Sequence, residues 1–78
     1  MRVSLTPEAV ADATESRRWY GERSPRTASA FVAELERAIL SLAESPLRWP
    51  PYLHGTRRLR LRRFPFGLIY RIALDEVQ

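Results

Sequence analysis

The stretch TRRLRLRRFPFGLIYRI, from Thr56 to Ile72, decides the fold of this protein. In its first half Leu59 and Leu61 alternate with arginines, and after a Pro-Phe-Gly triplet apolar residues recur at every second position. Alternation with a period of two is typical of strands that bury one face. The stretch therefore predicts two strands, residues 56–64 and 68–74, with a turn at residues 65–67 between them.

The same stretch carries a concentrated positive charge without any acidic residue. Its arginines are Arg57, Arg58, Arg60, Arg62, Arg63 and Arg71. Alternation predicts that Arg58, Arg60 and Arg62 share one strand face, at a spacing of about 7 Å. A purely solvated face normally mixes acids with bases, and like charges at this spacing add nothing to folding. We therefore predict that the six arginines bind a target or another polyanion; a solvated sheet face is the alternative interpretation.

Length and composition limit the class of protein. The chain has 78 residues, a net charge of +4, no cysteine and one histidine. Residues 1–53 are electrically neutral, so the excess charge lies in residues 54–74. These properties predict one domain over residues 1–78, with no disulfide, metal site or cofactor. No apolar run reaches the ~20 residues that span a bilayer, so we expect a cytoplasmic protein that does not associate with membranes.

The residues before this stretch predict one strand and two helices. Residues 2–6 alternate like a short strand. Thr6 and Ser24 are each followed by proline, which is the signature of a capped helix start. The first helix is expected to bury a face with Val10, Ala13, Arg17 and Tyr20, with Ala9 beside them. The second is expected to bury a face with Phe31, Leu35, Ala38, Ile39 and Leu42. Ser45-Pro46 ends the second helix, and residues 45–56 form a proline-rich connector.

The order strand, helix, helix, strand, strand predicts an α+β fold. One face of a small, mainly antiparallel sheet should cover the helical hairpin, which leaves the arginine face open or covered by a partner. The strand order cannot be derived from this pattern. A crossover through the helices would also allow the first strand to run parallel to a later one.

Taken together, these residues resemble the RelE/ParE family of toxins from type II toxin–antitoxin systems. The resemblance covers essentially the whole chain. The matching positions are Trp19 and Tyr20 before the hairpin turn, Phe31, Leu35, Ile39 and Pro46 in and after the second helix, and Arg58, Arg63, Phe64, Pro65, Phe66, Ile69, Tyr70 and Ile72 in the strands. The chain stops where the family's next strand would begin, so we expect a toxin domain that is short at its C-terminus.

The resemblance implies a growth inhibitor of the plasmid-stabilisation type, held inactive by a cognate antitoxin with an acidic, partly disordered segment. Its target is left open between DNA gyrase, inhibited by binding, and the ribosome, on which relatives cut mRNA. Nuclease relatives have an arginine just after the strand turn, where this chain has Gly67. We therefore favour a ParE-like binding inhibitor without its own hydrolytic activity. The alternatives are a RelE-like mRNA endonuclease and an inactive domain that still binds an antitoxin.

Four residues outside the arginine strip are candidates for contacts with a substrate or partner. His54 is a candidate general base, although a surface histidine in a loop is the simpler interpretation. Trp49, Tyr52 and Phe66 are candidate antitoxin contacts. Packing of the connector over the sheet would equally explain Trp49 and Tyr52.

Overall fold

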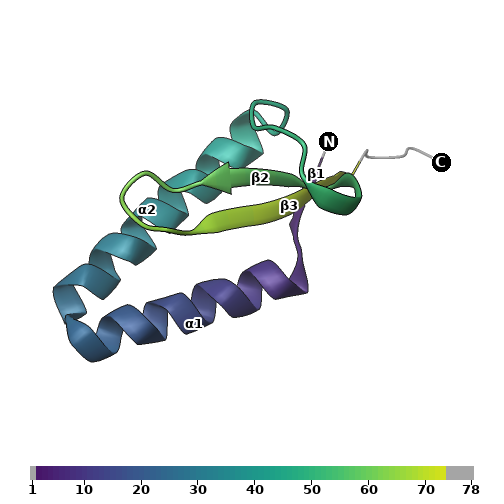
Figure 1. Cartoon of the computed structure of the whole chain (residues 1–78). Helices are drawn as coiled ribbons and strands as arrows, with labels where there is room; N and C mark the ends of the chain where they lie inside the picture. Colours follow the sequence, from purple (N-terminus) through teal and green to yellow (C-terminus); the bar gives the residue numbers. More distant parts are fainter. Residues whose placement is uncertain (1, 74–78) are drawn as a thin grey trace.

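The computed structural model describes residues 2–73, which form a helical hairpin and a three-stranded sheet (Figure 1). The elements are β1 (Arg2–Leu5), α1 (Pro7–Arg23), α2 (Pro25–Glu44), a short 3-10 turn (Leu53–Gly55), β2 (Arg57–Arg60) and β3 (Gly67–Ala73). The predicted α+β fold with an antiparallel sheet is confirmed. Neither helix in this part of the chain is long and apolar enough to cross a membrane.

The two helices begin where the capping residues predict. The Thr6 hydroxyl accepts the Ala9 amide at 3.1 Å, and the Ser24 hydroxyl accepts the Thr27 amide at 3.3 Å. Ser24 also donates its own amide to the Tyr20 carbonyl at 2.8 Å, so one residue ends α1 and starts α2. Because of this shared cap, a single residue separates the two helices.

β3 is the central strand of the sheet, with β1 on one side and β2 on the other. β1 pairs with β3 in antiparallel register, Leu5 opposite Tyr70, so the parallel arrangement that the sequence left open does not occur. β2 also pairs antiparallel with β3, Leu59 opposite Leu68. Leu74, predicted as the last residue of this strand, lies outside the described residues.

The core lies between α2 and the inner face of the sheet. The largest side chains without solvent access are Phe31, Leu42, Leu68 and Tyr70. Phe31 is also the centre of an aromatic cluster. The centroid of its ring lies 5.4 Å from that of Tyr20, 5.3 Å from that of Phe64 and 5.4 Å from that of Phe66. The aromatic residues of the turn between β2 and β3 thereby fix that turn against both helices.

Three residues predicted for the buried helix faces are exposed instead. Val10 is 52% exposed, Ile39 is 38% exposed, and Arg17 is also on the surface. On α1 the buried residue is Ala9, which the sequence placed beside the predicted face. α2 contributes three buried residues to the core and α1 one, so less of α1 is covered than the apolar spacing predicts.

The strand predicted for residues 56–64 is also shorter, since β2 ends at Arg60. Beyond it Leu61 still donates its amide to Phe66 at 2.9 Å, but the amide of Arg62 turns to the Glu34 carboxylate on α2 at 2.7 Å. The carboxylate of Glu34 on α2 thus accepts the amide of Arg62, and β2 does not continue as a strand. Alternation therefore stops, and Arg62 does not continue the face of Arg58 and Arg60.

Tyr70 anchors the connector to the sheet. Its hydroxyl donates to the Pro46 carbonyl at 2.6 Å. Burial raises the pKa of Tyr70, and the nearby positive charge of Arg57 partly offsets this. The hydroxyl therefore remains a proton donor at neutral pH.

We expect Tyr70→Phe to lower the free energy of unfolding by about 1 kcal/mol, because the Pro46 carbonyl loses its donor while the ring still fills the core. Urea denaturation measures this. Tyr52→Phe is the matched control and should change stability by less than about 0.5 kcal/mol, because this side chain is largely exposed. Equal losses in the two variants would contradict the anchoring role.

Candidate functional site

Strand alternation divides the arginines of the sheet between two faces. The outer sheet face, which points away from the helices, carries Arg58 and Arg60 from β2 and Gly67, Ile69 and Arg71 from β3. These residues alternate with the buried Leu59, Leu68 and Tyr70. The predicted basic face therefore exists, but with Arg71 in place of Arg62.

Arg58 is held in place on the outer sheet face by an aromatic ring and by a glycine. Its guanidinium carbon lies 4.5 Å from the centre of the Tyr52 ring. Its stem crosses Gly67 so closely that a Cβ atom at that position would lie 2.9 Å from Arg58 Cδ. A larger residue at position 67 would displace Arg58, so the glycine at the turn is what allows this arrangement. Cation–π stacking orients the guanidinium without neutralising it.

Within residues 2–73, Arg71 is held by a backbone carbonyl. Its Nη1 donates to the His54 carbonyl at 2.8 Å. His54 has φ 55° and Gly55 φ 72°, so the chain here forms a left-handed turn. The Thr56 hydroxyl, which donates to the Leu53 carbonyl, closes the same turn. Arg71 thereby brings His54 to the rim of the outer sheet face.

Arg57 does not belong to this face. It lies opposite Tyr70, on the inner side, and its Nη1 donates to the Trp49 carbonyl at 2.6 Å. A second, longer contact of 3.4 Å reaches the Leu47 carbonyl. The structure therefore gives Arg57 a scaffolding role, in which it satisfies carbonyl groups of the connector.

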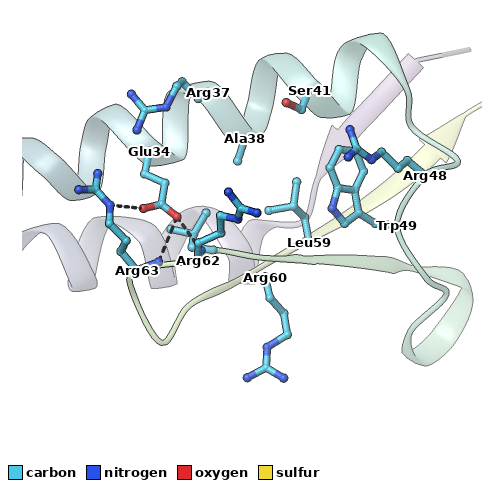
Figure 2. Close-up of a pocket in the computed structure, with 11 residues that line it drawn as sticks. Glu34, Arg37, Ala38, Ser41, Arg48, Trp49, Leu59, Arg60, Arg62 and Arg63 are labelled. Carbon is cyan, nitrogen blue, oxygen red and sulfur yellow. Dashed lines mark hydrogen bonds and ion pairs between the residues drawn. The ribbon is translucent and has the colours of Figure 1, made fainter.

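A second basic surface lies between α2 and the free edge of β2 (Figure 2). We call it the edge groove; it has a volume of about 650 Å³. It is lined by Glu34, Arg37, Ala38, Ser41, Arg48, Trp49, Leu59, Arg60, Leu61, Arg62 and Arg63. Figure 2 shows Arg62 on the α2 side of the strand, whereas Arg60 extends away from the helix. The groove thus has an apolar floor and a strongly basic rim.

Within residues 2–73, Glu34 is the only acidic residue that lines the edge groove, and its oxygens are already engaged. One oxygen accepts the Arg62 amide at 2.7 Å and the Arg63 amide at 3.4 Å, and the other accepts Arg63 Nε at 3.2 Å. Burial alone would raise the pKa of Glu34, but these three hydrogen bonds and the charge of Arg63 together hold it below its usual value. The carboxylate is therefore ionised and cannot neutralise Arg37 or Arg48 at the same time.

The connector covers only part of the β2 edge. Arg58 donates its amide to the Pro50 carbonyl at 3.2 Å, and Tyr52 donates its amide to the Thr56 carbonyl at 2.7 Å. In an antiparallel strand the amide two residues further on faces the same edge. The amide and carbonyl of Arg60 therefore face the edge groove, beyond the part that the connector covers.

The remaining sequence-predicted contacts are divided between the two surfaces. Tyr52 lies at the outer sheet face, and Trp49 forms one end of the edge groove. Phe66 packs half-buried against Phe31. Arg37 and Arg48 were not predicted as site residues, because they lie far from the arginine strip along the chain. For Arg37 the sequence does contain a signal. Glu34, Arg37 and Ser41 recur at helical spacing, which places them on one polar face of α2 beside its apolar stripe.

These features define a class of small basic proteins, in which a helical hairpin covers one side of an antiparallel sheet and arginines occupy the other. The model of the family described as "ParE toxin of type II toxin-antitoxin system, parDE" matches residues 3–78. The chain belongs to this family, and it is therefore a toxin of a type II toxin–antitoxin system, a family that implies an antitoxin partner. No curated protein and no solved structure gives a significant match.

We expect Glu34→Gln to lower the free energy of unfolding by about 1–2 kcal/mol at pH 7, because amides that bind a charged oxygen lose part of that interaction. The lowered pKa adds a pH dependence. Stability from this group is present above the unfolded value of about 4.3 and is lost as the pH falls through the lower folded value.

Urea denaturation between pH 3 and pH 7 tests both parts. The loss of stability below about pH 4.3 should be smaller in Glu34→Gln than in the unmodified chain. Glu36→Gln, on the exposed side of the same helix, is the control and should keep the full acid dependence. An unchanged profile in Glu34→Gln would contradict the assigned role.

Proposed function

We propose that this toxin inhibits growth by binding DNA gyrase, without hydrolytic activity of its own, and that a cognate antitoxin neutralises it by occupying the edge groove. The outer sheet face is the surface that would engage gyrase in its complex with DNA. The observation that carries the proposal is that the Tyr52 ring orients the guanidinium of Arg58 and the His54 carbonyl orients that of Arg71, and that neither guanidinium forms an ion pair with an acid within residues 2–73.

The chemistry of the outer sheet face supports binding rather than hydrolysis. Cutting RNA needs a group that takes the proton of the 2′-hydroxyl and another that protonates the leaving oxygen. Arginine is charged at all ordinary pH values and serves neither purpose. Tyr70, the tyrosine of β3, lies on the opposite face with its hydroxyl committed to Pro46. Gly67 stands where nuclease relatives have an arginine, and the stem of Arg58 fills the space beside it.

One observation favours a second candidate function, a RelE-like mRNA endonuclease. Arg71 binds the carbonyl of His54, which places the only histidine of the chain at the rim of the basic face. A general base must come within hydrogen-bond reach of the proton that it takes. The neighbouring guanidinium groups would then bind the phosphate.

The edge groove fits the acidic segment expected of an antitoxin. An extended peptide could pair with the backbone of Arg60 and cover Leu59 and Leu61, while its acidic side chains meet Arg37 and Arg48. Trp49 at the end of the groove would provide an aromatic contact. The predicted antitoxin contact at Trp49 is therefore part of this proposal; those at Tyr52 and Phe66 remain predictions.

Two cell-free assays test the target. The unmodified toxin should inhibit supercoiling by gyrase and should leave ribosome-bound mRNA uncut. Arg58→Gln and Arg60→Gln should each weaken inhibition, because each removes one charge from the outer sheet face, whereas His54→Ala should keep it. Codon-positioned mRNA cuts that disappear in His54→Ala would instead establish the endonuclease. Inactivity in both assays would favour an inactive antitoxin-binding domain.

Thermal unfolding with the antitoxin encoded beside the toxin tests the groove. At 100 times its dissociation constant the antitoxin should stabilise the toxin by about 2.7 kcal/mol. The double variant Arg37→Gln/Arg48→Gln should weaken this binding and reduce the shift. Arg17→Gln/Arg26→Gln, at exposed positions of α1 and α2 outside the groove, is the charge-matched control. An unchanged shift in the double variant would exclude the edge groove as the main contact.

A further inference from the structure

We propose that the outer sheet face binds the phosphodiester backbone of duplex DNA directly, without reading its sequence. This extends the proposed function, because a gyrase-directed inhibitor meets DNA on its target. The binding itself requires no gyrase. DNA binding by this face can therefore be tested without gyrase, and its outcome is independent of whether gyrase is the target.

The spacing of the guanidinium groups suits a row of phosphates. Arg58 and Arg60 are neighbours on one strand face, about 7 Å apart by strand geometry. Arg71 lies diagonally across from Arg58, because Arg58 is opposite Ile69 on β3, and such diagonal neighbours are about 7–8 Å apart. A DNA duplex presents one negative charge per about 1.7 Å of its axis. Each of the three arginines can therefore face a separate phosphate.

Two of these arginines are pre-organised for anion binding. The Tyr52 ring and the bare backbone of Gly67 fix Arg58, and the His54 carbonyl fixes Arg71. Holding a side chain in its bound geometry before association reduces the entropy lost on binding. Arg60 is exposed and makes no hydrogen bond or ion pair within residues 2–73. All of its donors are available to a ligand.

The surroundings favour a phosphate backbone over a protein surface. Protein interfaces are centred on buried apolar or aromatic anchors. Among the strand residues that face outward in the described sheet, Ile69 is the only large apolar one. The same face carries no acidic residue in that part of the chain. Repulsion between the guanidinium groups is relieved only when anions bind between them.

The aromatic residues favour duplex DNA over a single strand. Proteins that bind single strands stack bases on exposed aromatic rings. Tyr52 is the one aromatic side chain placed at this face, and the guanidinium of Arg58 already covers one side of its ring. Trp49 lies in the edge groove instead. The face thus offers charges for a backbone and little for unpaired bases.

Fluorescence anisotropy with a labelled duplex of about 20 base pairs and arbitrary sequence tests the proposal. Three phosphate contacts predict that affinity falls about 40-fold between 50 and 200 mM salt, from a slope of about −0.9 per contact. Arg58→Gln, Arg60→Gln and Arg71→Gln should each reduce that change to about 12-fold, from about two remaining contacts. The triple variant should not bind measurably at 200 mM salt.

Arg37→Gln and Arg48→Gln are the matched controls, because they remove the same charge from the edge groove and should keep the full salt dependence. Circular dichroism verifies that each variant is folded. Arg71→Gln removes the hydrogen bond to the His54 carbonyl and could loosen the turn at Leu53–Gly55. In that event the result for Arg60→Gln tests the proposal. The proposal is wrong if the duplex does not bind at 50 mM salt. It is also wrong if the salt dependence of the affinity falls as much in the control variants as in the outer-face variants. Tighter binding of an equally long single-stranded RNA, or of poly-glutamate of equal charge, would also overturn it.

Discussion

The structure depends on the burial of one face of β3 against α2. Phe31 and Leu42 from the helix and Leu68 and Tyr70 from the strand have at most 1% of their surface exposed. Burying such side chains contributes about 1.5–3 kcal/mol each, which is large for a domain of this size. Because side chains alternate along a strand, this burial forces Ile69 and Arg71 to the opposite face. The position of the basic surface is therefore a consequence of how the core is packed.

The register between β2 and β3 extends this constraint to the arginines of β2. With Leu59 opposite the buried Leu68, Arg58 and Arg60 must point outward, and Arg57 must point inward. A charge on the inner side is tolerable only because the connector folds back and offers the Trp49 carbonyl as an acceptor. The connector thus both satisfies Arg57 and supplies Tyr52 to the outer face. The proline-rich connector therefore contacts arginines on both faces of the sheet.

Glu34 separates the two basic surfaces. By binding the amides of Arg62 and Arg63, it ends β2 and turns the chain toward α2. Without this carboxylate the strip of arginines could continue along one strand, as alternation predicts. With it, Arg58 and Arg60 face outward on the sheet, whereas Arg62 and Arg63 line the edge groove beside the helix, which Arg60 also borders. One short segment thus contributes arginines to two surfaces of the protein.

The sequence by itself determined the order and type of the three strands and two α-helices of residues 2–73, the two helix caps and the membership of a toxin family. It did so because proline, serine and threonine act locally, and because periodicity reports burial directly. Only the tertiary structure decided which arginines act together. Arg62 left the predicted face through a hydrogen bond to a residue 28 positions away, and Arg71 joined that face through antiparallel pairing. Arg37 and Arg48 became part of the edge groove in the same way. Contacts between residues distant in sequence leave no local pattern, so the division of charge between two surfaces is a property of the fold.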